Sequence, residues 1–581
     1  MPTMLPEEIL VLIFENFALP DIGVLGDVQE DVRHFHETLG DVWTGAQPSE
    51  ISTYRKPKTE DEIYCYQLEI GECLEALYSL CLTCKSFHRL AWPILYRGFT
   101  THMLDTWLNQ DRQLPSATLL RTICLKPEYG YALRSLSIGD WDPIEAMDAM
   151  DLFNLLQGDA TIVALFQWRA RAFWFGDELE NETLSIPEEL HDEDPIQRSL
   201  HRSLNMGLLD GHITLLLLMC PNIRHLDISP PLDFATSTFA NLLRIVLSKD
   251  FKSKPLPDPI PDFEEEESDY IVAQMFGAPW PNQKLQKPLV LQQLRSLTIR
   301  SPGITSLDFR FLKQLMSLPS LEILRVNDLE GGFPKALAML DVKSKCPQLK
   351  TLQFLECQLN ANELAAIVEC CPNLEKLYVV WTKFRTSHDH RAHLTPEYCI
   401  HYGTITKALA EHCPNLTVLK LGGPEGRCNV GAEPKHPFII GDSLHPLGRL
   451  AVLQVDAHSI YGSEYGLYGG FLAETVPENL VVLEVSSWEE HDPSINRINS
   501  FDFQEHQDLD LEVFLKSESC HRLGRVELPG RVRAYDLDGV KKRGWEIRKY
   551  DNPLSIGNCY DVLINKARLE AHGFERFARW T

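Results

Sequence analysis

Two cysteines, Cys81 and Cys84, form a Cys-x-x-Cys pair, and Cys65 and Cys73 lie nearby in the sequence. Paired thiolates at this spacing are half of a typical structural zinc site, which needs a second ligand pair at suitable spacing. The sequence offers no convincing second pair, and the helical run around the first pair indicates thiols buried in a core. We therefore predict no metal site from these residues.

A second polar cluster, His388, His390 and His393, offers imidazole ligands in a polar, loop-like segment that lacks a partner motif. We interpret it as a solvated loop, with contact to a target protein as the alternative. The hydrolase motif Gly-x-Ser-x-Gly is absent, because Gly441-Asp-Ser443 lacks the second glycine. Phosphate-binding and dinucleotide-binding glycine motifs are also missing. We therefore predict no catalytic residue, no cofactor and no enzymatic activity.

Composition narrows the class of protein further. The chain has 581 residues, too many for one compact core, so several domains or an elongated repeat array are expected. Its net charge of -27 argues against nucleic acid as a partner, and no apolar run is long enough to cross a membrane. The acidic start lacks a basic secretory signal, and the 15 scattered cysteines are typical of reduced thiols. We expect a cytoplasmic or nuclear location and no membrane contact.

Beyond about residue 115, a short apolar-x-x-apolar-x-apolar pattern recurs along the chain. The anchors Leu294, Leu321, Leu349 and Leu374 recur about every 25 to 28 residues, within the range of leucine-rich repeats. Longer intervals elsewhere indicate insertions. The copies are Leu133–Ile138, Ile223–Ile228, Leu294–Ile299, Leu321–Val326, Leu349–Phe354, Leu374–Val379, Leu416–Leu421, Leu450–Val455, Leu480–Val485 and the weaker Leu523–Leu528.

This pattern predicts an α/β fold in which each copy supplies one short strand. A single strand with one covering helix cannot bury its apolar side, whereas stacked copies share a continuous core. We predict an irregular leucine-rich repeat solenoid over 115–535, with parallel strands on the concave face and helices and loops on the convex face. Loops are expected at about 179–195 and 253–269, and residues 536–581 are expected to form a cap or tail.

The first 100 residues predict a helical module in two parts. Apolar residues at helical spacing run from Leu5 to Phe17, with Pro6 and two glutamates in the first turn, as is typical of a helix start. A polar insertion of about 21–71 follows. Helical periodicity then returns and ends near Pro93.

The run from Leu5 to Leu10 and the later run from Leu80 to Tyr96 resemble the two halves of an F-box. That family opens with Leu-Pro-x-Glu-Ile and closes with Cys-Lys/Arg-x-aromatic followed by Pro-x-Leu-Tyr. The long insertion departs from the pattern, as does Phe87, where the family often has Trp. The resemblance implies docking on a Skp-type adaptor, and through it on a cullin, by Leu5, Pro6, Ile9, Leu12, Ile13, Leu77, Leu80 and Phe87.

The same resemblance implies a non-catalytic substrate receptor of a Skp-cullin-F-box ubiquitin ligase, whose repeats bind an unknown protein target. Strand positions between the anchors are the candidate target contacts, with Arg325 and Tyr378 as the preferred anchors. The alternatives are that these positions are solvated strand residues, and that the chain is a non-ligase repeat scaffold or signalling protein with a degenerate F-box. The candidates are Asp227, Thr298, Arg325, Gln353, Tyr378, Lys420, Gln454 and Glu484.

Overall fold

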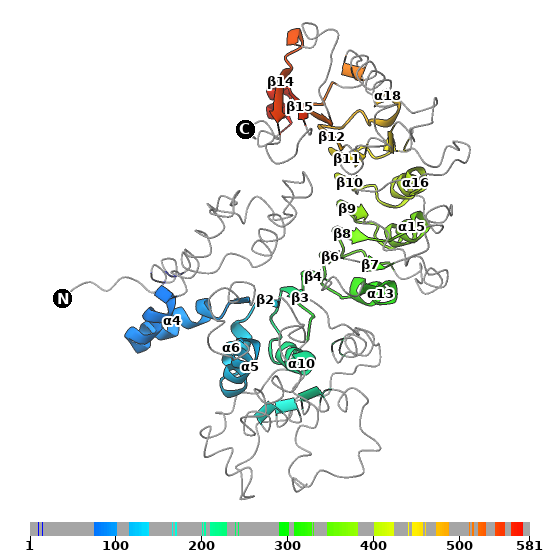
Figure 1. Ribbon diagram of the computed structural model, residues 1–581. Helices are drawn as coiled ribbons and strands as arrows, with labels where there is room; N and C mark the ends of the chain where they lie inside the picture. The colour runs from blue at the N-terminus through cyan, green and yellow to red at the C-terminus, as the bar shows by residue number, and fades with distance from the viewer. Residues whose placement is uncertain are drawn as a thin grey trace, which may run out of the picture. The chain divides into compact units, whose positions relative to one another are not determined.

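The computed structural model shows an α/β protein with two compact units (Figure 1). The N-terminal unit comprises Met1–Thr305 and Ser317–Leu321, and the C-terminal unit comprises Ser306–Met316 and Glu322–Thr581. The structure describes residues 10, 14, 75–100, 115–138, 165–166, 169–170, 200, 203–204, 209–228, 239, 242, 290–300, 307–327, 329–330, 345–381, 400–422, 440, 444–456, 459–460, 472–486, 511, 514–515, 521–529, 541–551 and 559–572.

Four parallel strands of the N-terminal unit pair in the order β1-β2-β3-β4 (Figure 1). Their register places Ser135, His225 and Ser296 opposite one another. The strands are β1 (Gly98–Thr100), β2 (Ser135–Ile138), β3 (His225–Ile228) and β4 (Ser296–Ile299), and the helices are α4 (Lys85–Leu95), α5 (Pro115–Leu125), α6 (Glu128–Ala132) and α10 (Leu209–Met219). Residues 75–83 are also helical and lie directly before α4.

The C-terminal unit has a parallel run in the order β6-β8-β9-β10-β11-β12-β13, followed by β15 and β14 in antiparallel pairing. A separate two-stranded pair is formed by β5 and β7. The strands are β5 (Leu307–Asp308), β6 (Ile323–Asn327), β7 (Leu329–Glu330), β8 (Thr351–Cys357), β9 (Lys376–Trp381), β10 (Val418–Gly422), β11 (Val452–Asp456), β12 (Val482–Ser486), β13 (Arg525–Pro529), β14 (Glu546–Asp551) and β15 (Cys559–Ile564).

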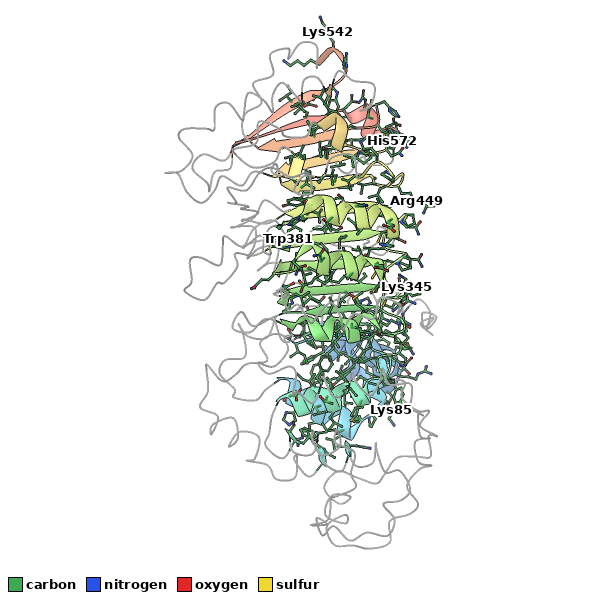
Figure 2. The ribbon with its side chains drawn as sticks, turned by 90° about the vertical axis from the view of Figure 1, so that its right-hand side faces the viewer. Lys85, Lys345, Trp381, Arg449, Lys542 and His572 are labelled. Atoms are coloured by element: carbon green, nitrogen blue, oxygen red, sulfur yellow. The ribbon has the colours of Figure 1, made fainter. Side chains whose placement is uncertain are left out.

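Helices of the C-terminal unit lie along one face of its strands, where α15 and α16 flank β8 to β10 (Figure 1). Figure 2 shows Lys345 and Arg449 along one edge of this unit and Trp381, the last residue of β9, at the opposite edge. The helices are α13 (Phe309–Met316), α15 (Ala361–Glu369), α16 (Tyr402–His412), α18 (Leu472–Thr475) and α21 (Lys566–Ala571).

The helix α15 has a complete start signal in its own sequence. The side chain of Asn360 accepts hydrogen bonds from the amides of Asn362 and Glu363, each at 3.0 Å. In return, the carboxylate of Glu363 accepts the amide of Asn360 at 3.0 Å. This capping box satisfies amides that a helix start otherwise leaves without partners, so the helix begins at Ala361.

The core consists of the repeated apolar anchors. Leu294, Leu321, Leu349 and Leu374 are completely buried, and each begins an equivalent repeat. Each fully buried leucine contributes about 1.5 to 3 kcal/mol from removal of its surface from water. The prediction of an α/β protein with stacked parallel strands is therefore confirmed.

Asparagine and glutamine side chains join consecutive repeats at the turn that precedes each strand. Asn222 donates to the carbonyl of Tyr131 at 2.7 Å, and Asn373 donates to the carbonyl of Pro347 at 2.9 Å. Both residues follow a Cys-Pro pair in the sequence. Each of these asparagine amides thus satisfies a carbonyl of the preceding repeat.

Three predicted segments, 21–71, 179–195 and 253–269, lie outside the described residues, and so does the histidine cluster at 388–393. The predicted domain boundaries stay predictions. Within the part of the chain that the structure describes, no helix is both long and apolar enough to span a bilayer.

Candidate interaction surfaces

Residues from both sides of the long polar insertion share one small core in the N-terminal unit. Phe14, Leu77, Ala91 and Ile94 are buried together, at 3%, 0%, 0% and 4% exposure. The ring of Phe14 packs edge-on against that of Phe87, with centroids 5.5 Å apart and planes at 81°. Such edge-to-face pairs contribute about 0.5 to 1.5 kcal/mol beyond the burial of their area. Phe14, which precedes the insertion, therefore shares a core with residues that follow it.

The predicted adaptor contacts fall into three groups. Leu5, Pro6, Ile9, Leu12 and Ile13 lie outside the described residues. The side chains of Leu80 and Phe87 are half-buried and pack against the small core. Leu77 is completely buried, because it is the helical residue that faces Phe14 and its neighbours. It stabilises the module, and we correct its assignment as a direct partner contact.

Two apolar residues of the same module, Tyr78 and Leu82, are instead exposed. Tyr78 is 56% exposed and Leu82 is 69% exposed. Residues four apart on a helix lie on the same face, so this pair forms one apolar stripe on the helix at 75–83. The sequence indicates this exposure, because neither Tyr78 nor Leu82 falls on the helical stripe of buried residues that includes Leu77. The pair is a candidate contact for a partner helix or groove.

The Cys-x-x-Cys pair belongs to the same region. Cys84 is exposed, and its sulfur caps α4 by accepting the amide of Phe87 at 3.5 Å. Cys81 is half-buried, and burial raises its pKa. The prediction that both thiols are buried is therefore wrong for Cys84, because the pair spans the break between two helices. Among the described residues, no group of three or more His, Cys, Asp or Glu could hold a metal ion.

The six target-binding candidates of the C-terminal unit occupy one row across its parallel strands, which we call the strand-face row. Its register pairs each residue with the next, in the order Arg325, Gln353, Tyr378, Lys420, Gln454 and Glu484. Neighbouring strands lie about 4.8 Å apart, so the row extends over about 24 Å. It carries a cation on β6 (Arg325), a second on β10 (Lys420) and an acidic residue on β12 (Glu484).

Exposure divides the strand-face row into two halves. Arg325, Gln353 and Tyr378 are buried, at 7%, 7% and 4% exposure, whereas Lys420, Gln454 and Glu484 are half-buried. Side chains on adjacent strands cover one another at this spacing. The accessible half is therefore the one around β10 to β12, and the preferred anchors Arg325 and Tyr378 offer little surface.

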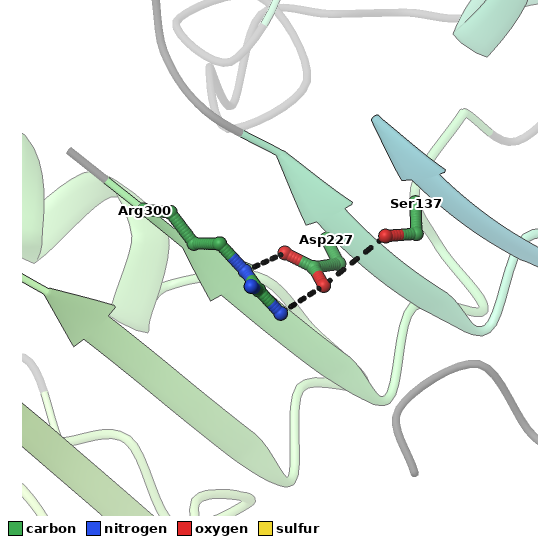
Figure 3. Close-up of polar contacts among 3 residues, drawn as sticks. All are labelled: Ser137, Asp227 and Arg300. Atoms are coloured by element: carbon green, nitrogen blue, oxygen red, sulfur yellow. Dashed lines mark hydrogen bonds and ion pairs between the residues drawn. The ribbon is translucent and has the colours of Figure 1, made fainter. Parts of the chain in front are cut away.

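In the N-terminal unit, the strand residue Asp227 forms a polar cluster with Arg300 and Ser137 (Figure 3). Arg300 donates through Nε to Oδ1 of Asp227 at 2.8 Å and through Nη2 to Oδ2 at 2.7 Å. The hydroxyl of Ser137 donates to Oδ2 at 3.2 Å. The side chains of Arg300 and Asp227 are only 12% and 8% exposed. Arg300 neutralises the negative charge of Asp227 within the chain. We therefore interpret Asp227 as a residue that stabilises the fold, not as a contact for a target protein.

One buried titratable side chain, His212, stands apart from these surfaces. It lies on α10 at 2% exposure, edge-on to the ring of Phe166 at 5.2 Å between centroids. Its Nδ1 has no hydrogen-bond partner within the described part of the chain. Burial lowers the pKa of His212 to about 4, so the imidazole is neutral at physiological pH. A buried neutral imidazole next to an aromatic ring fits a packing role.

Comparison with known proteins adds no family assignment. No protein-family model matches the chain, and no curated protein matches its sequence.

Proposed function

We propose that this chain is the substrate-recognition adaptor of a Skp-cullin-F-box ubiquitin ligase. The helical module docks on a Skp-type adaptor and through it on a cullin. The stacked repeats hold a protein target, and the transfer chemistry belongs to other subunits. Holding a target beside a charged conjugating enzyme raises the effective concentration of its lysines, which is the whole contribution of such a subunit.

The observation that carries this proposal is the packing of Phe14 against Phe87 and Leu77. The F-box resemblance consists of two sequence halves, and it has physical meaning only if those halves meet. The core that Phe14 shares with residues after the insertion supports such a meeting, and long surface loops impose only a modest entropic cost. Tyr78 and Leu82 supply exposed apolar area on the closed module.

The target-binding part of the proposal is supported by the accessible half of the strand-face row. Lys420, Gln454 and Glu484 present a cation, an amide and a carboxylate on three adjacent strands. Their backbones are fixed by the parallel ladder, so their side chains are held at regular spacing. A rigid row of mixed polarity suits recognition of a partner with complementary charge order.

Co-purification from cells tests the adaptor-docking step. Wild-type chain should retain the Skp-type adaptor and the cullin, whereas Tyr78→Asp plus Leu82→Asp should lose both, because two carboxylates would be desolvated in an apolar interface. Ser79→Asp plus Ser86→Asp is the matched control, since it adds the same charge at two exposed polar positions of the same module. The control should retain the adaptor.

The outcomes separate the two functional classes. Wild-type chain that retains no adaptor would overturn the ligase proposal and leave the non-ligase repeat scaffold. Equal loss in both double variants would show that added charge, not the apolar pair, is responsible. Retention by the Tyr78 and Leu82 variant would remove that surface from the proposal.

A further inference from the structure

Three sulfur-containing side chains gather where two helices of the N-terminal unit pack together. Cys124 lies near the end of α5, Met219 is the last residue of α10, and Cys220 follows it directly. The thiol of Cys124 donates to Sδ of Met219 at 3.6 Å, although 95 residues separate the two in the chain. We call Cys124, Met219 and Cys220 the sulfur cluster.

The thiol of Cys220 lies close enough to Cys124 for the two ionisations to affect each other. Burial raises the pKa of Cys220, and the thiol of Cys124 raises it further. Gly130 leaves space for the turn that carries Cys220. A Cβ atom on Gly130 would lie 2.5 Å from the carbonyl oxygen of Met219 and 3.4 Å from Sγ of Cys220. The glycine therefore allows α6 to approach the sulfur cluster closely.

The fold does not require sulfur atoms to gather at such a turn. Cys413 occupies the same Cys-Pro-Asn sequence in a repeat of the C-terminal unit. Its thiol donates to the carbonyl oxygens of Val368 and Cys371, each at 3.5 Å. The other buried thiols offer no rival site, because no group of three or more His, Cys, Asp or Glu within the described residues could hold a metal ion.

The ligand types in the sulfur cluster suit one class of metal ion. Thiolate and thioether sulfurs are the soft ligands that select monovalent copper. Metal–sulfur bonds are about 2.3 Å long, so two sulfurs on one metal lie no more than about 4.6 Å apart. The separation of 3.6 Å between Cys124 and Met219 meets this limit. Three ligands would leave tetrahedral Zn²⁺ without its fourth.

Arg169 supplies positive charge beside the sulfur cluster. Its Nε and Nη2 donate to the carbonyl oxygen of Cys124 at 3.0 and 2.6 Å. Burial raises the pKa of the Cys124 thiol to about 12, and the charge of Arg169 opposes that rise. Two thiolates around Cu⁺ carry one net negative charge. The guanidinium therefore stabilises the loaded site more than the empty one.

Met219 connects the sulfur cluster to solvent. Met219 is half-buried, whereas Cys124 and Cys220 are 0% and 1% exposed. A copper ion can therefore reach the thioether first and the two thiols afterwards.

We propose that the sulfur cluster binds one monovalent copper ion. The ion arrives as Cu⁺, so no electron is transferred. Bonds form from copper to Sγ of Cys124, Sγ of Cys220 and Sδ of Met219, and the two thiol protons leave to solvent. This site lies outside both surfaces of the proposed function and does not depend on it.

Copper titration of the full-length, reduced chain tests the inference. The probe is Cu⁺ held by a coloured chelator, and transfer to the protein is followed by loss of that colour. Wild type should take one ion. Its affinity for Cu⁺ should rise about a hundredfold per pH unit, because two protons are released on binding. Copper should also raise the unfolding temperature, since it binds the folded state.

Two variants of the sulfur cluster have matched controls in the C-terminal unit. Cys220→Ala should lower the affinity for Cu⁺ about a hundredfold or more, and Met219→Leu should lower it about tenfold. The controls are Cys413→Ala at the equivalent turn and Met316→Leu at another methionine, and both should bind Cu⁺ as wild type does. Met219→Leu conserves apolar volume, so it tests the site even if Cys220→Ala does not fold.

Three results would overturn the inference: no ion taken up by wild type, equal weakening in the cluster variants and their controls, or an affinity that does not change with pH. Cys84→Ser provides the final arm, because Cys84 is an exposed thiol with Cys81 nearby. Loss of the bound ion in Cys84→Ser would assign copper to that pair and so also overturn it.

Discussion

Phe14 and Phe87 pack edge to face with ring centroids 5.5 Å apart, although the whole polar insertion at 21–71 separates them in the chain. This contact joins a residue that precedes the insertion to one that follows it. The neighbours Leu77 and Ala91 have no exposed surface, so the pair is part of a packed core. Phe14 thus packs with residues that follow the insertion.

Replacing Phe14 by alanine should open the module. Loss of a buried phenylalanine costs about 3 to 5 kcal/mol through lost burial and the remaining cavity. Hydrogen exchange of the amides in α4 should accelerate, while α15 in the C-terminal unit should exchange as in wild type. Phe14→Leu retains most of the apolar volume and should show a smaller effect. Unchanged exchange in α4 after Phe14→Ala would contradict the shared core.

The cluster of Asp227 and Arg300 predicts strong coupling between two substitutions. Asp227→Asn should destabilise the N-terminal unit by about 3 to 5 kcal/mol, because it leaves a largely buried guanidinium without its counter-charge. Asp227→Asn plus Arg300→Gln removes both charges and should recover a large part of that loss. The measurement is chemical unfolding of the two single variants and the double variant. Additive effects would mean that the pair contributes nothing as a pair.

His212 predicts a loss of stability in acid. Its ordinary pKa is 6.5 and burial lowers it to about 4 in the folded chain, so protons bind more tightly to the unfolded state. The stability is complete above about pH 6.5 and declines as the pH falls toward 4, by at most about 3 kcal/mol. His212→Phe keeps an aromatic side chain beside Phe166 but cannot titrate. The unfolding free energy of this variant should depend less on pH between 6.5 and 4. An unchanged dependence on pH would mean that groups other than His212 cause the acid sensitivity.

The cysteines should differ sharply in their reaction with iodoacetamide. Cys84 is exposed, whereas burial raises the pKa of Cys124, Cys357 and Cys413 to about 12 each. Because the thiolate is the reactive form, these buried thiols should remain unmodified in the native chain at pH 8 and react after unfolding. Peptide mass spectrometry after a brief reaction measures this. Native modification of Cys124 at the rate of Cys84 would contradict the burial.

The sequence by itself determined the repeat pattern and the class of fold. The anchors Leu294, Leu321, Leu349 and Leu374 are all completely buried, because apolar residues at a fixed spacing can leave water only by stacking. The helix start at Asn360 follows from the same kind of local information, since its capping partners lie within three residues. Local spacing is sufficient where the interacting groups are neighbours in the chain.

Only the tertiary structure decided which predicted contacts are accessible. Leu77 fits the apolar stripe of its helix equally well as a partner contact or as a core residue, and burial against Phe14 decides for the core. The sequence pattern predicts a buried Cys84, but a helix break exposes it. Arg134, Arg224 and Arg295 lie side by side only because strand register aligns residues from distant repeats. Side-chain exposure and long-range register depend on pairings between distant segments, which local sequence patterns do not specify.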